Sequence, residues 1–224
     1  MKIGALVSGG KDSLFALYLM KQKKYDIACI MTMNSISDES YMFHYPNVDI
    51  VKKQAELMNI PYIEGKTEGK KEEELKDLQD LIKNAKENYH IEGICTGAIN
   101  SIYQKSRIDK IAEKYNLESF APLWERDPES LLKEMFENNF EIIITGVAAE
   151  GLNETHLEMN LKSTLEYLKK LNEKYSLHIA GEGGEYETLV LNCPLFSERI
   201  VVKKSKIIAN EQIKSAMLLI EKIE

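Results

Sequence analysis

The residue types that bind phosphate gather at six consecutive positions near the N-terminus, Ser8-Gly9-Gly10-Lys11-Asp12-Ser13. They follow a short apolar run at residues 3–7 and precede residues 14–20, whose apolar spacing predicts a helix. In a strand–loop–helix unit, the loop amides and the helix N-terminus converge on an anion. Glycine allows close backbone approach, and lysine and serine supply a cation and hydroxyl donors. The loop therefore predicts a phosphate site, in which Asp12 is a candidate metal ligand or helix cap.

This loop differs from the two commonest phosphate-binding motifs. A Walker A loop needs glycine five residues before the glycine of Gly-Lys and a hydroxyl residue after the lysine, whereas Ala5 and Asp12 stand there. The GxGxxG pattern of dinucleotide-binding folds is also missing from the loop. The sequence therefore indicates a different class of nucleotide site.

The first 121 residues alternate between apolar runs and amphipathic segments. We expect strands at residues 3–7, 26–33, 62–63, 93–96 and 117–121, with helices between them. This alternation predicts an α/β fold with a Rossmann-like parallel sheet wound through right-handed crossovers. Ligands bind beyond the carboxyl ends of such strands, so residues 31–34 and 96–99 are expected beside the phosphate loop.

The pattern changes after Pro122, and a smaller C-terminal α+β domain is expected at residues 122–224. Helices are expected near residues 131–136 and 161–168, and strands at residues 142–147, 188–191, 200–202 and 207–208. The stretch from residue 213 onward fits a helix and a strand equally well. Residues 1–121 then form the expected N-terminal domain, which carries the phosphate loop.

A second glycine-rich segment, residues 181–188, carries three glutamates. Glu182, Glu185 and Glu187 would repel phosphate, so we expect them to attract a cation or to take a proton from an amine. Aromatic faces also attract cations, and Tyr186 and Trp124 are candidates for that role. A turn with solvated glutamates is the alternative.

Composition restricts the class of protein. The chain has 224 residues, 44% hydrophobic and 29% charged, which is typical of a globular protein. A net charge of −7 argues against a nucleic-acid partner. Neither an export signal nor a membrane span is expected. The three cysteines form no CxxC pair, which favours the cytoplasm, a buried position for Cys29 and Cys95, and no zinc site.

The block at residues 8–13 resembles the PP-loop of the ATP pyrophosphatase family, whose fold is of the adenine nucleotide alpha hydrolase-like type. The resemblance implies that the loop holds the pyrophosphate part of ATP while a substrate oxygen attacks the α phosphate. The adenylate that forms is then displaced by a nucleophile. ATP and Mg²⁺ are therefore the expected cofactors. Residues 1–121 are then the expected ATP-binding domain, and residues 31–34 and 96–99 its expected adenosine pocket. Enzymes with this loop act on several substrates, so the loop indicates the chemistry and not the substrate.

Further blocks resemble the diphthine–ammonia ligase (diphthamide synthase) family along the whole chain. They lie at residues 40–47, 97–99, 103–107, 122–124 and 181–189. The resemblance implies ATP-dependent amidation of diphthine on translation elongation factor 2 to diphthamide, with AMP and pyrophosphate as products. The expected partners are elongation factor 2 and ammonia, and a homodimer is the assembly considered.

The sheet edge and the family resemblance together supply the expected site residues. Those expected to bind ATP are Ser8, Gly9, Gly10, Lys11, Asp12, Ser13, Met33, Gly97, Ala98, Gln104 and Arg107. Those expected to act in catalysis are Lys11, Glu182, Glu185 and Glu187, with Asp12 as the metal ligand. Those expected to contact the substrate are His44, Trp124, Gly183, Gly184, Tyr186 and Thr188. For Arg107 a surface salt bridge, and for His44 a local hydrogen bond, are the alternatives; Glu150 is a further candidate.

Two other functions stay open at the level of sequence. One is a PP-loop tRNA-modifying enzyme, although sulfur transfer needs paired reactive thiols and tRNA needs a basic surface. The other is a non-catalytic sensor that binds ATP without hydrolysing it. Release of pyrophosphate on addition of substrate separates an enzyme from a sensor.

Overall fold

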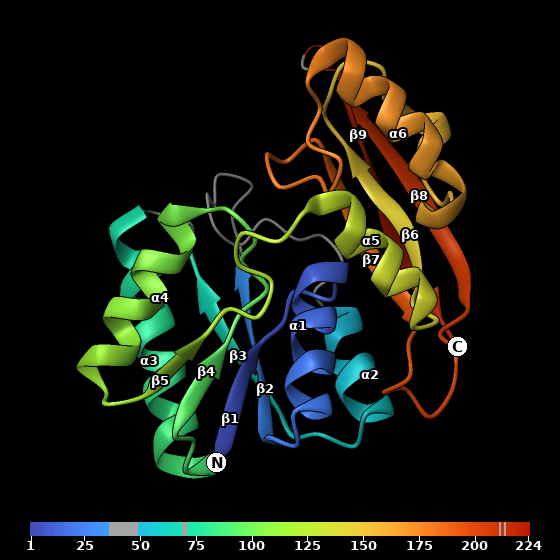
Figure 1. The fold of residues 1–224 in the computed structure, drawn as a ribbon. Helices are drawn as coiled ribbons and strands as arrows, with labels where there is room; N and C mark the ends of the chain where they lie inside the picture. The colour runs from blue at the N-terminus through green and yellow to red at the C-terminus, as the bar shows by residue number, and fades with distance from the viewer. Residues whose placement is uncertain (36–48, 69–70, 211, 213) are drawn as a thin grey trace. The chain divides into compact units, whose positions relative to one another are not determined.

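The computed structural model describes residues 1–35, 49–68, 71–210, 212 and 214–224. The chain divides into two compact units, Met1–Trp124 and Glu125–Glu224 (Figure 1). This division lies after residue 124, close to the expected boundary after residue 121. In the described part of the chain, no helix is both long and apolar enough to cross a membrane.

The first unit alternates strands and helices. Its elements are β1 (Lys2–Leu6), α1 (Lys11–Gln22), β2 (Asp26–Ser35), α2 (Asp49–Leu57), β3 (Tyr62–Thr67), α3 (Lys71–Tyr89), β4 (Gly93–Cys95), α4 (Ile102–Lys114) and β5 (Glu118–Phe120). The five strands are parallel, in the order β3-β2-β1-β4-β5. Helices α1 and α2 cover one face of this sheet, and α3 and α4 cover the other (Figure 1). The expected parallel α/β sheet is confirmed.

Burial on both faces explains why these strands read as continuous apolar runs. On one face, Leu78 and Ile82 of α3 and Ile108 and Ile111 of α4 pack with Ile94 of β4 in a single buried cluster. The apolar stripe of each helix faces the sheet, and most of its charged residues face solvent. Burial of these side chains, at about 25 cal/mol per Å² of apolar surface, holds the strand ends in place.

The strand order places the carboxyl ends of β1 and β4 side by side. From β1 the chain proceeds outward through β2 and β3, and it then crosses to β4 on the other side of β1. Such a reversal opens a crevice in doubly wound sheets, where ligands bind. The loops after β1 and β4 therefore border the place where a nucleotide site is expected.

The second unit is built on an antiparallel sheet. Its elements are α5 (Pro128–Glu137), β6 (Glu141–Val147), the 3₁₀ turn η1 (Glu154–His156), α6 (Leu161–Tyr175), β7 (Tyr186–Asn192), β8 (Val202–Asn210) and β9 (Ser215–Ile223). The strand order is β7-β6-β9-β8. The expected α+β architecture is confirmed for this unit.

Two expectations about the last strands need correction or completion. The short strands expected at residues 200–202 and 207–208 are one strand, β8, which begins at Val202. Most β8 side chains are exposed, so the alternation that marks a strand is weak there. The ambiguous last stretch is strand β9, in which Ala216 and Leu218 are buried two residues apart, as a strand requires.

Candidate active site

The phosphate loop connects β1 to α1. Gly9 has a φ of +86°, a conformation that glycine adopts at little cost and other residues rarely adopt. Gly10 is the N-cap of α1, with extended backbone. The first N–H groups of a helix have no acceptor within the helix, and glycine has no side chain to bind them. The N-terminus of α1 is therefore suited to binding an anion.

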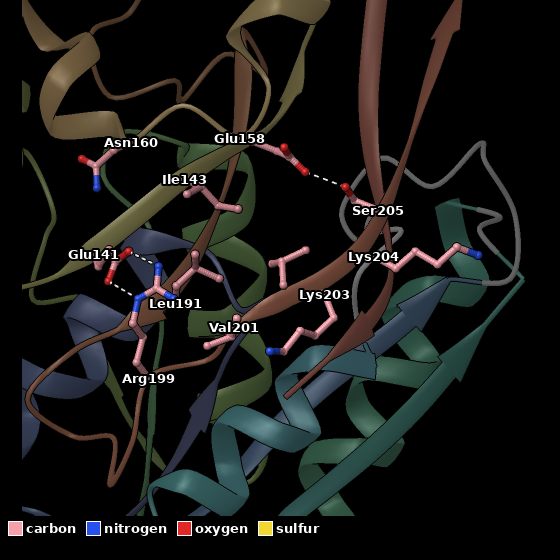
Figure 2. A pocket seen from close by; sticks show the side chains of 11 residues that line it. Glu141, Ile143, Glu158, Asn160, Leu191, Arg199, Val201, Lys203, Lys204 and Ser205 are labelled. Atoms are coloured by element: carbon pink, nitrogen blue, oxygen red, sulfur yellow. Dashed lines mark hydrogen bonds and ion pairs between the residues drawn. The ribbon is translucent and has the colours of Figure 1, made fainter.

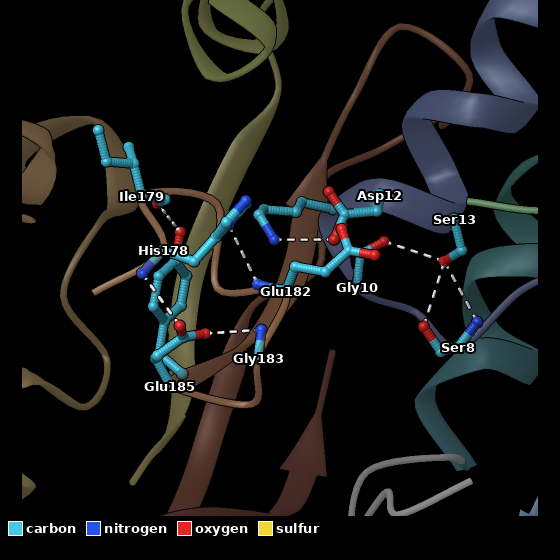
Figure 3. A network of polar contacts seen from close by, with 11 residues as sticks. Ser8, Gly10, Asp12, Ser13, His178, Ile179, Glu182, Gly183 and Glu185 are labelled. Carbon is cyan, nitrogen blue, oxygen red and sulfur yellow. Dashed lines mark hydrogen bonds and ion pairs between the residues drawn. The ribbon is translucent and has the colours of Figure 1, made fainter. Parts of the chain in front are cut away.

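Ser13 closes the loop on itself. Its Oγ accepts a hydrogen bond from the backbone N of Ser8 at 3.2 Å and donates one to the carbonyl oxygen of Gly10 at 3.1 Å (Figure 3). The two serine Oγ atoms lie 3.3 Å apart. The single hydroxyl proton of Ser13 is thus committed to the loop. In this geometry Ser13 shapes the phosphate site, and Ser8 is the better placed of the two to donate to a ligand.

A buried ion pair lies at the start of α1. Lys11 is only 3% exposed, and its Nζ lies 2.8 Å from Oδ2 of Asp12. Burying an ammonium group is costly unless an anion or hydrogen-bond acceptors surround it. The Asp12 carboxylate supplies that charge here. A phosphate group at the helix N-terminus would add a second negative partner for Lys11.

Asp12 also fits the donor chemistry of a Mg²⁺ site. Mg²⁺ is usually held by one or two carboxylates together with substrate phosphates and water. The described residues contain no group of three or more His, Cys, Asp or Glu that could hold a metal. A Mg²⁺ ion beside Asp12 would therefore take its remaining ligands from phosphate and water, as it commonly does with nucleotides.

Two buried polar side chains that the sequence analysis missed hold the strand end and the loop. The Oγ1 atom of Thr32 on β2 donates to the carbonyl of Val7 at 2.9 Å, and Nε2 of Gln54 on α2 donates to the carbonyl of Gly9 at 3.2 Å. Thr32 interrupts the apolar residues of β2, and Gln54 lies on the apolar stripe of α2, three residues after Val51. A polar residue within an otherwise apolar strand or helix stripe is the sequence signal that could have identified both residues.

The loop after β4 contacts the start of α1. A Cβ atom at Gly97 would lie 2.6 Å from the backbone of Asp12 and Ser13, so glycine is needed at this position. Ala98 is buried beside it. Met33, expected in the adenosine pocket, lies in the buried cluster between the sheet and α3. Of these three, Gly97 lies directly against the phosphate loop.

Gln104 and Arg107 lie on α4, which begins after the β4 loop. Gln104 donates its backbone N–H to the Ser101 hydroxyl, the N-cap of this helix, and its side chain is exposed. Arg107 folds back on its own helix: its guanidinium lies 3.2 Å from the centroid of the Tyr103 ring, and Nη1 donates to the Tyr103 carbonyl. In place of the surface salt bridge considered as the alternative, the structure shows this stacking, and the role of Arg107 in ATP binding stays a prediction.

The Trp124 ring already faces a cation. Nζ of Lys105 lies 5.5 Å from the ring centroid and also pairs with Asp109 at 2.6 Å. The indole is half-buried. The ring face of Trp124 therefore has a lysine ammonium as its neighbour, and its contact with substrate stays a prediction.

In the second unit, Glu185 and Tyr186 fold the glycine-rich segment. The Glu185 carboxylate accepts the backbone N–H of His178 at 3.0 Å and that of Gly183 at 2.8 Å (Figure 3). The Tyr186 hydroxyl donates to the carbonyl of Ile179 at 2.6 Å, and the residue is 2% exposed. The expected use of the Tyr186 ring as a cation-binding face needs correction in this conformation, because the ring is buried.

The other two glutamates have different surroundings. The backbone N of Glu182 donates to Nδ1 of His178 at 3.4 Å, and its side chain is partly exposed. Glu187 lies on β7 with its side chain exposed. Thr188, the next residue, is buried and pairs with Ile144 of β6. Glu187 is therefore the carboxylate of this segment that is most open to solvent.

The remaining candidates lie away from these loops or outside the described residues. His44 belongs to residues 36–48, which the structure does not describe. Glu150 is 62% exposed and lies 3.7 Å from Lys214. His156 caps η1, where its ring nitrogen accepts from the backbone N of Asn153. His156 therefore has a local structural role.

All three cysteines are free and buried, which confirms the interpretation for Cys29 and Cys95. Burial raises the pKa of the Cys29 and Cys95 thiols to about 12 and that of Cys193 to about 11. A thiolate is the reactive form of cysteine. These thiols are therefore unsuited to act as nucleophiles at neutral pH.

A separate groove of about 470 Å³ lies in the second unit, between β6 and the first half of β8 (Figure 2). At one end Arg199 forms a bidentate pair with Glu141, and at the other Ser205 donates to Glu158. Of the expected site residues that the structure describes, none lines this groove. Its two lysines, Lys203 and Lys204, pair with Glu224 and Glu221, which lie outside the lining.

Two family models account for nearly the whole chain. Residues 1–119 match the diphthamide synthase N-terminal domain, and residues 127–223 match the diphthamide synthase C-terminal domain. The chain belongs to the diphthamide synthase family. The two matches fall within the two compact units, Met1–Trp124 and Glu125–Glu224, so each unit corresponds to one domain of this family.

Curated proteins similar to this diphthamide synthase family member are named diphthine–ammonia ligase. The one from Bos taurus is 37% identical over 229 residues, covering 94% of this chain and 86% of that protein. The one from Rattus norvegicus is 38% identical over 225 residues, covering 92% and 84%. The one from Homo sapiens is 36% identical over 227 residues, covering 93% and 85%.

One solved structure also aligns with the family member. It is described as a predicted subunit of tRNA methyltransferase from Methanocaldococcus jannaschii, and it is 17% identical. The alignment covers 87% of this chain and 98% of that one, with a TM-score of 0.46. That likeness is too weak to support any conclusion about function.

Proposed function

We propose that this chain is a diphthine–ammonia ligase. It uses ATP to activate the carboxylate of diphthine on translation elongation factor 2, and ammonia then converts that carboxylate to the amide of diphthamide. The observation that carries the proposal is the loop between β1 and α1, with its glycine N-cap and the buried Lys11–Asp12 pair. Membership of the diphthamide synthase family supplies the substrate class.

In this mechanism the loop binds the β and γ phosphates of ATP. The N–H groups at the start of α1 donate to phosphate oxygens, and Lys11 offsets their charge. When bound beside Asp12, Mg²⁺ supplies further positive charge to the same oxygens. Because Lys11 and the backbone of the loop are held by buried contacts, they need little rearrangement when ATP arrives.

Activation forms an acyl adenylate. A carboxylate oxygen of diphthine attacks the α phosphorus, and the bond from that phosphorus to the bridging oxygen of pyrophosphate breaks. Lys11 and the loop amides stabilise the charge that develops on the departing pyrophosphate. An adenylate exposed to water would hydrolyse, so the site has to exclude water between the two steps.

Amidation consumes the adenylate. Ammonia attacks the acyl carbon, the bond from that carbon to the AMP oxygen breaks, and the nitrogen loses a proton. We assign the second unit to binding the elongation factor and this nucleophile. Glu187 and Glu182 supply negative charge, either to take that proton or to attract the trimethylammonium group of diphthine.

A product assay tests the proposal. The purified chain is incubated with ATP, Mg²⁺, an ammonium salt and elongation factor 2 bearing diphthine. Mass spectrometry of the modified peptide follows the amide, and AMP and pyrophosphate are measured in parallel. We expect one AMP and one pyrophosphate for each amide formed. ATP binding without any pyrophosphate release would favour the sensor, and formation of ADP would exclude the adenylate.

A further inference from the structure

Gln54 is a fully buried polar residue that makes a long-range contact to the phosphate loop. It lies on α2 with 0% exposure, beside the buried residues Val51 and Ala55. Its Nε2 reaches a carbonyl 45 residues away in the sequence, that of Gly9, at 3.2 Å. A buried amide on an otherwise apolar helix face is costly unless it is hydrogen-bonded.

Because a peptide group is planar, the hydrogen bond from Gln54 to the Gly9 carbonyl also sets the direction of the Gly10 N–H group. The Gly9–Gly10 peptide is trans, so the Gly9 C=O and the Gly10 N–H lie in one plane and point in opposite directions. The carbonyl points toward Gln54 on α2. The Gly10 N–H therefore points away from α2, and it belongs to the N-cap residue of α1.

Neighbouring carbonyls are held in the same manner. Thr32 donates to the carbonyl of Val7, and Ser13 donates to that of Gly10. Glycine peptides rotate more readily than others, since φ of Gly9 is +86° and no Cβ restricts it. Of these three side-chain contacts, the one from Gln54 acts on the peptide between the two glycines.

We propose that Gln54 is a positioning residue for ATP: by holding the Gly9 carbonyl, it orients the Gly9–Gly10 peptide so that the Gly10 N–H donates to a phosphate oxygen. The proposal rests on the proposed function of the loop. Without the side-chain donor, the Gly9 carbonyl would be left buried without this hydrogen bond, and the peptide would rotate toward another partner. The amide donor would then be lost to the ligand.

The test compares pyrophosphate binding by full-length variants, measured by titration calorimetry with Mg²⁺ present. Gln54→Met keeps length and burial but removes the donor, and Gln79→Met makes the same change on α3, where Gln79 only accepts from Lys114. We expect Gln54→Met to weaken pyrophosphate binding about tenfold, as the loss of a charge-assisted hydrogen bond does. Gln79→Met should bind as the wild type does, and circular dichroism should be native for both.

A spectroscopic measurement follows the Gly10 N–H group directly, first in the wild type and then in Gln54→Met. With ¹⁵N-labelled glycine, the Gly10 amide resonance should move on addition of pyrophosphate, and this shift should be smaller in Gln54→Met. A merely structural role for Gln54 would change the melting temperature and leave the Gly10 shift intact.

Equal pyrophosphate affinity in a folded Gln54→Met, or a Gly10 amide that does not respond while other loop amides do, overturns the inference. If the wild type binds no pyrophosphate at all, the function proposed for the loop fails instead.

Discussion

At the scale of single residues, the buried pair of Lys11 and Asp12 combines a structural and a chemical role. Lys11 has little contact with water, and Asp12 supplies its counter-charge at 2.8 Å. Truncation of either side chain would leave the other charge poorly compensated. The resulting loss of folding free energy would exceed what a surface ion pair contributes. In the proposed mechanism, the pair would therefore link ATP binding to the local stability of the loop.

Lys11→Ala should lower kcat/KM for ATP by about a hundredfold or more, because it removes the lysine that neutralises phosphate charge in the loop. Lys21→Ala, an exposed lysine at the other end of α1, is the matched control and should retain activity. Pyrophosphate release in the product assay measures both. A folded Lys11→Ala protein with wild-type ATP affinity and turnover would remove the loop from the mechanism.

Glu185 and Glu187, two residues apart, should respond differently to the same substitution. Glu185→Gln loses one of two acceptor oxygens that fold the segment, so it should lower the melting temperature by several degrees. Glu187→Gln changes an exposed carboxylate and should leave stability and ATP binding unchanged while slowing amide formation. If added ammonium restores the rate of Glu187→Gln, the carboxylate acts on ammonia; if it does not and the apparent affinity for elongation factor falls, it binds the substrate. Normal amidation in Glu187→Gln would exclude both roles.

At the scale of elements, the strand and helix pattern of the first unit is predictable because each element carries a full apolar stripe or run. The parallel order and the position of the phosphate loop follow from that alternation. The contacts of Thr32 and Gln54 are not predictable in the same way, because they join residues 25 and 45 positions apart. The roles of Glu185 and Tyr186 are likewise set by tertiary packing, which residue type alone does not reveal.

The cysteines of β2 and β4 should make the fold sensitive to alkaline pH. Burial raises the pKa of Cys29 and Cys95 to about 12, whereas an unfolded thiol titrates at about 8.5. Above about pH 8.5, the two thiols thus keep their protons in the folded state and lose them in the unfolded state. Their contribution to the free energy of unfolding is therefore fully present below the unfolded pKa and falls as the pH rises toward 12. Urea unfolding under reducing conditions between pH 8 and pH 11 measures this loss. A Cys29→Ala, Cys95→Ala variant should show a smaller decline over that range, and an identical slope would contradict the assignment.

At the scale of the whole molecule, the chain carries 29 basic and 36 acidic residues. A net charge of −7 gives little counterion release on contact with a phosphate backbone. The charge thus favours a protein substrate over tRNA, in agreement with the diphthamide synthase family and its two domain models. The phosphate loop alone does not distinguish these partners, because enzymes with this loop act on several kinds of substrate.

The purified chain should therefore bind tRNA weakly at physiological salt. Its dissociation constant for tRNA should lie in the range of non-specific binding, about 10⁻⁴ to 10⁻⁶ M. A gel shift at two salt concentrations measures it. Tight, strongly salt-dependent binding would instead favour the tRNA-modifying alternative.

Gly97 makes the phosphate loop and the β4 loop mechanically dependent on each other. Because the backbone of Gly97 lies against that of Asp12 and Ser13 with no room for a methyl group, neither loop can shift while the other stays in place. A ligand that holds one loop in place should then also reduce the motion of the other loop. Pyrophosphate alone, with no adenosine to contact, should slow amide hydrogen exchange at residues 96–101 as well as at residues 8–13, as detected by mass spectrometry. Protection confined to residues 8–13 would show that the two loops move independently. Protection of both would mean that the enzyme senses the arrival of phosphate on the side where it is expected to receive the adenine base.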